Sequence, residues 1–129
     1  MNLLLDTHIW LWLVENPKQL GTHAARELAN SANELWLSPV STWEVLLLHR
    51  KRRLVLPANP DDWLPTALAG IQKHAPLTHE IALAAERLAL HDDPADRFLA
   101  ATALVHDLTL VTADQRLLGL GNIRTMANR

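Results

Sequence analysis

The chain has 129 residues, the length of one domain, with 49% hydrophobic and 20% charged residues and a net charge of −2. This balance excludes a disordered or low-complexity chain, and it argues against a protein that coats nucleic acid through bulk positive charge. Cysteine is absent, which excludes disulfides, thiolate zinc sites and cysteine nucleophiles, so any metal ion must have oxygen or nitrogen ligands.

The first half of the chain alternates short apolar runs with helical patterns. Three consecutive leucines between polar residues predict a strand that is buried on both faces, as in a parallel sheet. In chain order we expect a strand at 3–5, a helix at 7–15, a helix capped by Thr22, a strand at 35–38 ended by Pro39, a helix opened by Ser41 and ended at 49–53, and a helix from Asn59 to about His74.

The second half continues this alternation, and its clearest strand is short, β-branched and apolar. In chain order we expect a weak strand at 75–77, a helix capped by Thr78, a helix that starts at 93–96, a strand at 108–112, a short helix at 116–118 and a final strand at 123–125. Strands that alternate with helices predict an α/β fold, in which a parallel sheet of four or five strands is covered on both faces. We expect a single domain over residues 1–129.

The sequence also bears on where the protein acts. The N-terminus has no basic segment, and no apolar run approaches the roughly 18 residues that a membrane span needs. The absence of cysteine is compatible with a reducing cytosol. We therefore expect a cytoplasmic protein with no membrane partner.

Acidic residues stand next to several of the predicted strands. Asp6, Glu44 and Asp114 follow three different strands, and Asp96 opens the helix beside the last of them. In a parallel sheet such positions share one edge, outside the carboxyl ends of the strands, where ligands bind. Each acid also has a structural interpretation. Glu44 completes a capping box with Ser41, and the others fit helix caps or first turns, which the helix dipole favours.

A cluster of carboxylates needs a counter-ion. Two carboxylates ~4 Å apart repel by about 4 kcal/mol at an effective dielectric near 20, which is a large part of a domain's ~5–15 kcal/mol stability. Oxygen ligands, with no cysteine and no paired histidines, favour Mg²⁺ or Mn²⁺, which take phosphate oxygens as further ligands. The spacing therefore indicates phosphodiester hydrolysis.

Four motifs resemble, in order and spacing, those of PIN-domain ribonucleases, and most closely those of VapC-like toxins of bacterial toxin–antitoxin pairs. They are Leu3-Leu4-Leu5-Asp6-Thr7-His8, Ser41-Thr42-Trp43-Glu44-Val45, Asp93-Pro94-Ala95-Asp96-Arg97-Phe98-Leu99-Ala100-Ala101 and Leu110-Val111-Thr112-Ala113-Asp114. The resemblance spans nearly the whole chain. It implies an α/β/α sandwich, Mg²⁺- or Mn²⁺-dependent endonucleolytic cleavage of RNA, a homodimer, and a hetero-oligomer with a small antitoxin that inserts a segment into the active-site groove.

The resemblance also implies roles for individual residues. The acidic quartet with catalytic and metal-binding roles is Asp6, Glu44, Asp96 and Asp114. Our hypothesis is that Asp6 and Asp96 ligate the ion, while the other two bind it through water or hold a second ion. Thr7 and Thr112 match small hydroxyl positions, and Asp93 matches a peripheral acid. The family commonly has Pro-Phe-Asp-Arg where this chain has Pro-Ala-Asp-Arg, a change that affects local packing and leaves the chemistry alone.

Other residues keep two interpretations. Arg97 contacts phosphate or neutralises a neighbouring acid. The run Arg50-Lys51-Arg52-Arg53 attracts RNA, or it stabilises a helix C-terminus by a favourable interaction with the helix dipole. His8 is a metal ligand or base beside the first acid, or an ordinary surface histidine. The five tryptophans stack nucleobases or pack within the protein. We expect core packing for Trp10, Trp36 and Trp43, and an interface position for Trp12 and Trp63.

Other enzyme classes fit less well. A response-regulator receiver needs an acidic pair after its first strand and a later lysine, and a haloacid-dehalogenase-like phosphatase needs an aspartate where this chain has His8. Two alternatives stay open: a catalytically silent RNA- or protein-binding module with the same fold, and a structure-specific nuclease outside a toxin–antitoxin system. A metal-dependent cleavage assay distinguishes the silent module from a nuclease. Offering RNA and DNA of matched sequence distinguishes the structure-specific nuclease from the toxin ribonuclease.

Overall fold

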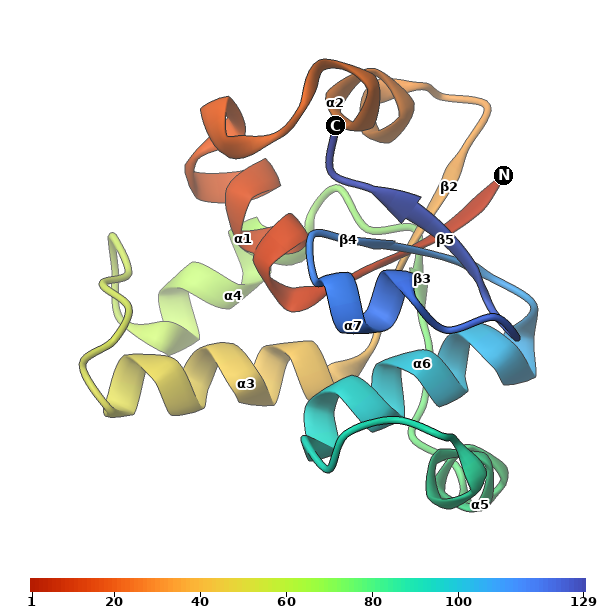
Figure 1. Ribbon diagram of the computed structural model, residues 1–129. Helices are drawn as coiled ribbons and strands as arrows, with labels where there is room; N and C mark the ends of the chain where they lie inside the picture. The colour runs from red at the N-terminus through yellow and green to blue at the C-terminus, as the bar shows by residue number, and fades with distance from the viewer.

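The computed structural model describes residues 1–129, in which five short strands form one parallel sheet with helices on both faces (Figure 1). In chain order the elements are β1 (Asn2–Leu5), α1 (Thr7–Glu15), a 3-10 turn η1 (Pro17–Gln19), α2 (Thr22–Ala29), β2 (Glu34–Leu37), α3 (Pro39–Arg50), α4 (Pro60–Leu68), β3 (Lys73–His74), α5 (His79–Arg87), α6 (Pro94–His106), β4 (Thr109–Thr112), α7 (Gln115–Leu118) and β5 (Arg124–Ala127). The expected α/β fold with a central parallel sheet is confirmed.

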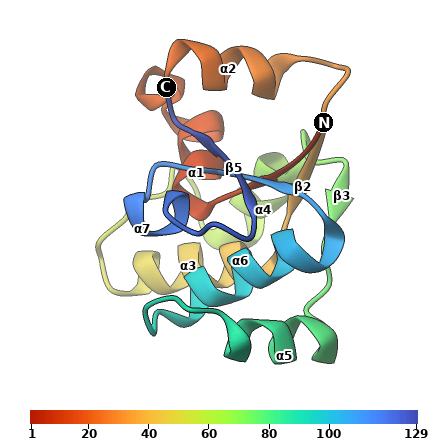
Figure 2. The ribbon, with the colours of Figure 1, turned by 45° about the vertical axis from the view of Figure 1, so that its right-hand side comes forward.

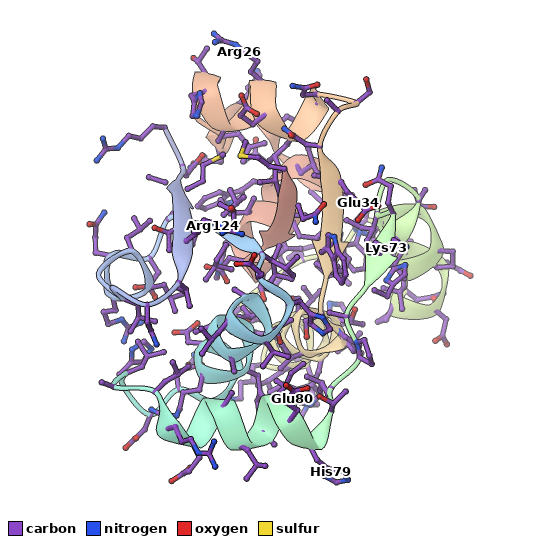
Figure 3. The ribbon with its side chains drawn as sticks, turned by 90° about the vertical axis from the view of Figure 1, so that its right-hand side faces the viewer. Arg26, Glu34, Lys73, His79, Glu80 and Arg124 are labelled. Carbon is purple, nitrogen blue, oxygen red and sulfur yellow. The ribbon has the colours of Figure 1, made fainter.

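The strand order is β3-β2-β1-β4-β5, so the first strand lies in the middle of the sheet. Leu4 is paired in register with Trp36 on one side and Leu110 on the other. The two edges of the sheet are β3, which carries Lys73, and β5, which carries Arg124 (Figure 3). Because helices cover both faces of the sheet, the three leucines of this middle strand are fully buried, as the sequence predicts.

Alternation along β1 divides the core into two layers. Leu3 and Leu5 point into one hydrophobic cluster, which also contains residues of α1 and α4, such as Trp10 and Trp63. Leu4 points into the other cluster, which α5 and α6 cover. Figure 2 shows α5 and α6 together on that side, with α2 at the other end of the molecule. No helix is both long and apolar enough to cross a bilayer.

The start of α3 differs from the prediction. The helix begins at Pro39, and the hydroxyl of Ser38 caps it by accepting a hydrogen bond from the amide of Val40 at 3.1 Å. The proline that ends the strand therefore also forms the first turn of the helix, where its fixed φ fits and its missing N–H costs nothing. The predicted capping box of Ser41 and Glu44 is wrong, and Glu44 lies in the second turn.

Two further boundaries are corrected by long-range contacts. The helix from Asn59 ends at Leu68 rather than near His74, and the expected weak strand at 75–77 is replaced by β3 at Lys73–His74. The amide of Ala75 donates to the carbonyl of Leu37 at 2.9 Å, so the chain there follows β2. Pairing with a distant strand overrides the local helical pattern.

The remaining helix and strand ends shift by a single residue or a few. Thr22 is the first residue of α2 and Gly21 is its cap, so the predicted threonine cap is wrong. The amide of Ala24 is instead satisfied by the carbonyl of Arg129 at 2.8 Å. The final strand starts one residue later than predicted and ends two residues later, so it covers Arg124–Ala127.

Tryptophan placement is correct for some positions and wrong for others. Trp10 is fully buried, as expected, whereas Trp43 is 53% exposed on α3 and is not a core residue. Trp63 is 4% exposed rather than at an interface. Its ring lies 5.3 Å from that of Trp10, and its Nε1 donates to Glu15 at 2.8 Å. Trp36 is half-buried and packs against the second cluster.

Candidate functional site

A pocket of about 350 Å³ opens at the carboxyl edge of the sheet. Strands in a parallel sheet all end at this edge, and helices that follow them begin there, as α1 does after β1 and α7 after β4 in Figure 1. The residues that line the pocket are Asp6, His8, Trp12, Glu44, Asp93, Asp96, Ala113, Asp114 and Arg116. The four acids of the predicted quartet, together with the peripheral acid, are thus brought to one cavity.

Asp6 both caps α1 and faces the pocket. Its Oδ1 accepts from the amide of Thr7 at 2.7 Å, and its Oδ2 accepts from the hydroxyl of Thr112 at 2.6 Å. The same hydroxyl oxygen accepts from the amide of Asp114 at 3.0 Å. Thr112 therefore links the ends of two neighbouring strands, and burial of Asp6 raises its pKa despite these hydrogen bonds.

Glu44 reaches the pocket from the second turn of α3 and has no capping role. Burial raises its pKa, a hydrogen bond with Thr7 opposes the shift, and repulsion from neighbouring aspartates adds to it. Oγ1 of Thr7 also lies 3.0 Å from Oγ of Ser41, within hydrogen-bond distance, which ties the start of α1 to α3. Because the predicted capping box does not form, helix capping does not explain the presence of Glu44 at this position.

Asp96 lies in the first turn of α6, which Asp93 caps by accepting the amide of Asp96 at 3.0 Å. Its Oδ2 is 2.6 Å from Nε2 of His91, a residue that sequence reasoning missed. Burial raises the pKa of Asp96, the hydrogen bond with His91 opposes this, and repulsion from nearby aspartates adds to it. The one signal in the sequence is a histidine five residues before the acid.

Arg97 fixes the loop that carries His91. Its Nη1 donates to the carbonyl of Leu90 at 2.6 Å, and its Nη2 donates to that of Leu88 at 3.0 Å. Further bonds reach the carbonyls of Glu86 at 3.1 Å and His91 at 3.3 Å. The structure thus gives the guanidinium a role that differs from both interpretations offered by the sequence, because its contacts are backbone carbonyls and it does not line the pocket.

Asp114 caps α7 and holds the second residue that sequence reasoning missed. Its Oδ1 accepts from the amide of Arg116 at 2.8 Å, and its Oδ2 lies 3.0 Å from Nη2 of the same residue. That nitrogen is also 3.8 Å from Oδ2 of Asp96. Hydrogen bonding by the Arg116 guanidinium lowers the pKa of Asp114, in contrast to the other three acids.

The donor set of the pocket fits a hard divalent cation, because it consists of carboxylates whose mutual repulsion a cation would relieve. No three histidine, aspartate or glutamate side chains are grouped closely enough to hold an ion as they stand. Both oxygens of Asp6 accept hydrogen bonds within the fold, and one oxygen of Asp96 is bound to His91. A cation would therefore have to exchange some of these contacts for its own.

The other candidate residues lie at the rim or outside the pocket. His8 is exposed and its ring lies 5.9 Å from that of Trp12, so both rings stand on the rim. The basic run 50–53 is exposed at the end of α3 and does not line the pocket.

Comparison with known proteins covers almost the whole chain. The family model of the PIN domain matches residues 3–122. Ribonuclease VapC22 of Mycobacterium tuberculosis (strain ATCC 25618 / H37Rv) is 34% identical over 117 residues, which are 89% of this chain and 88% of that protein. In the crystal structure of VapBC2 from Rickettsia felis bound to a promoter DNA fragment, one chain matches with a TM-score of 0.74 at 15% identity over 98% of each chain. VapBC-5 from M. tuberculosis, a member of the VapBC family of toxin–antitoxin systems, gives a TM-score of 0.61 at 16% identity over 99% of this chain and 98% of that one.

Proposed function

Because the chain belongs to the PIN domain family, we propose that it is a Mg²⁺- or Mn²⁺-dependent endoribonuclease that acts as the toxin of a toxin–antitoxin pair. The observation that carries the proposal is the convergence of Asp6, Glu44, Asp96 and Asp114 on one pocket at the carboxyl edge of the sheet. RNA as the substrate is supported by the relative at 34% identity, which is named a ribonuclease.

In this proposal the two most buried acids, Asp6 and Asp96, would hold the cation directly. Glu44 and Asp114 would contact it through water or hold a second ion. When bound, such an ion lowers the pKa of a coordinated water and stabilises the oxygens of an in-line phosphodiester displacement.

The chain itself orients these acids. The hydroxyl of Thr112 fixes Asp6 at 2.6 Å, and His91 fixes Asp96 at the same distance. Hydrogen bonds behind a metal-binding carboxylate set its direction and typically change metal affinity or activity by about 10–100-fold. Glu44 caps no helix, so no helix amide occupies its carboxylate.

The proposal extends to partners and location. We propose a cytoplasmic protein, one PIN domain over residues 1–129, that forms a homodimer and a hetero-oligomer with a cognate antitoxin. The fold likeness to a chain of a VapBC toxin–antitoxin system supports an antitoxin partner. The surface of α3 supports a protein contact, because Trp43 and Leu46 are 53% and 37% exposed there. Light scattering of the purified chain should give the mass of a dimer, and a monomer at all concentrations would contradict this part.

The test of activity uses RNA and DNA of matched sequence, in EDTA and after addition of Mg²⁺ or Mn²⁺. We expect cleavage of RNA only, and only with the metal. The double variant Asp6→Asn, Asp96→Asn should be inactive. Asp107→Asn is a matched control, because Asp107 is 84% exposed outside the pocket and its φ of 55° suits asparagine. Metal-dependent cleavage by the double variant would remove the assignment of these acids.

A second candidate is a catalytically silent PIN module that binds RNA or protein. The observation in its favour is that the acids are not grouped as a ligand set and that both oxygens of Asp6 are already bonded. RNA binding without cleavage at saturating Mn²⁺ would select this candidate. Cleavage of DNA as well as RNA would instead select a structure-specific nuclease.

A further inference from the structure

Arg116 is a positive side chain inside a pocket that is otherwise acidic. Its Nη2 lies 3.0 Å from Oδ2 of Asp114 and 3.8 Å from Oδ2 of Asp96, and its Nε donates to Oδ1 of Asp114 at 3.3 Å. It is the one arginine or lysine among the residues that line the pocket. The guanidinium thus touches two of the acids that the proposed function assigns to a divalent cation.

The fold does not depend on this side chain. Arg116 is 62% exposed, and its contacts are the two acids of the pocket together with its own backbone amide, which Asp114 caps. The cap uses the amide alone, so α7 keeps it when the side chain moves or is shortened. A long, exposed stem can turn away from the pocket without a change in the backbone.

The charges of the pocket show what the guanidinium does there. Repulsion between neighbouring acids contributes to the raised pKa of Asp6, Glu44 and Asp96, whereas Asp114, which Arg116 binds directly, has a lowered pKa. One positive side chain offsets part of the repulsion, and it does so at the oxygens that a cation would use.

We infer that Arg116 is a built-in counter-ion of the acidic pocket, which a divalent cation must displace from Asp96 and Asp114. This rests on the proposed function, since it takes the pocket to be the cation site. The consequence is that Arg116 weakens metal affinity and that metal binding frees its guanidinium at the rim of the pocket. Exposed ion pairs are weak, so we expect removal of the charge to tighten binding by about two- to fivefold.

The test is calorimetric titration of Mn²⁺ into the whole chain without RNA. Arg116→Gln removes the charge and keeps a shorter, polar side chain. Arg124→Gln is the matched control, because Arg124 is 61% exposed and pairs with Asp107 at 3.0 Å, away from the pocket. Both variants lower the net charge equally, so long-range effects on a cation are the same. Circular dichroism confirms that each variant is folded.

We expect Arg116→Gln to bind Mn²⁺ about two- to fivefold more tightly than the unmodified chain and Arg124→Gln to bind it with unchanged affinity. In EDTA, Arg116→Gln should also melt at a lower temperature, and Mn²⁺ should raise its melting temperature more than it raises that of the control. If Mn²⁺ binds equally well to both variants, or less well to Arg116→Gln, the inference is overturned and the metal site stands. If no variant binds Mn²⁺, the proposed metal site fails and the inference fails with it.

Discussion

The buried wall of the acidic pocket and its exposed rim contain the same chemical group in opposite electrostatic situations. On the wall, Asp6 and Asp96 are about 8% and 9% exposed, their partners are a threonine hydroxyl and a histidine, and burial raises their pKa. On the rim, Asp114 is bound by Arg116 and has a lowered pKa. The difference indicates that positive charge lies closer to the rim carboxylate, 3.0 Å from Asp114, than to the wall carboxylate Asp96, 3.8 Å away. A divalent cation should therefore matter most to the wall.

The largest expected effect is on cleavage. Asp6→Asn should lower the rate of RNA cleavage by roughly 100-fold or more, since a metal ion contributes several kcal/mol to the transition state. Asp114→Asn should lower it less, because this acid is assigned to indirect or second-ion binding. Initial rates on one RNA at saturating Mn²⁺ compare the two. Equal losses would erase the distinction between wall and rim.

The next effect concerns the support of the wall. Arg97→Lys keeps the charge and loses the planar fork that holds four carbonyls, so the loop with His91 should loosen. We expect a loss of about 1–3 kcal/mol in the free energy of unfolding, measured in urea, because three part-buried carbonyls lose their donors. Arg87→Lys, at the exposed end of α5, is the control and should be neutral. A neutral Arg97→Lys would show that the loop is held by other contacts.

A smaller effect concerns stability without metal. In EDTA, Asp96→Asn should raise the melting temperature by a few degrees, because about 1 kcal/mol shifts it by roughly 3–6 °C in a domain of this size. The reason is relief of burial and repulsion of the charge, and Asp93 keeps the cap of α6. Asp114→Asn should lower it or leave it unchanged, because that charge is paired. A lower melting temperature for Asp96→Asn would mean that its bond to His91 outweighs the repulsion.

The smallest effect is on pH dependence. A carboxyl whose pKa is raised in the folded state binds protons more readily there than in the unfolded chain, so stability falls as pH rises through the folded pKa. In EDTA the three acids with a raised pKa, Asp6, Glu44 and Asp96, should make the chain more stable as pH drops from neutral into the acid range. Asp114, whose pKa is lowered, opposes this effect. Urea midpoints along this range measure the slope, and the Asp6→Asn, Asp96→Asn variant should flatten it. An unchanged slope in that variant would contradict the assignment.

Local patterns predicted the parts of the fold whose determinants are local. β1 and α1 follow from a leucine run and helical spacing, and α6 begins at Pro94, within the predicted start at 93–96. β3 was missed because two residues pair with a distant strand, and Pro39 was read as a stop although it also begins a helix. The misplaced start of α3 hid the fact that Glu44 caps nothing.

The site was predictable in its acids and not in their partners. Four acids stand beside strands or at a helix start. They can be found from the sequence because ligands bind at the carboxyl ends of parallel strands. His91 and Arg116 have no such signal, because they meet Asp96 from two separate segments, the loop before α6 and the helix α7. Only the folded chain places one oxygen of that aspartate between them.

Crystals of the chain soaked with Mn²⁺, measured at a wavelength where manganese scatters anomalously, test the central claim most directly. We predict a peak in the pocket, within ligand distance of Asp6 and Asp96, with the guanidinium of Arg116 turned away. No peak at saturating Mn²⁺, or a peak on the surface with the pocket contacts of Asp6 and Asp96 intact, would contradict the account.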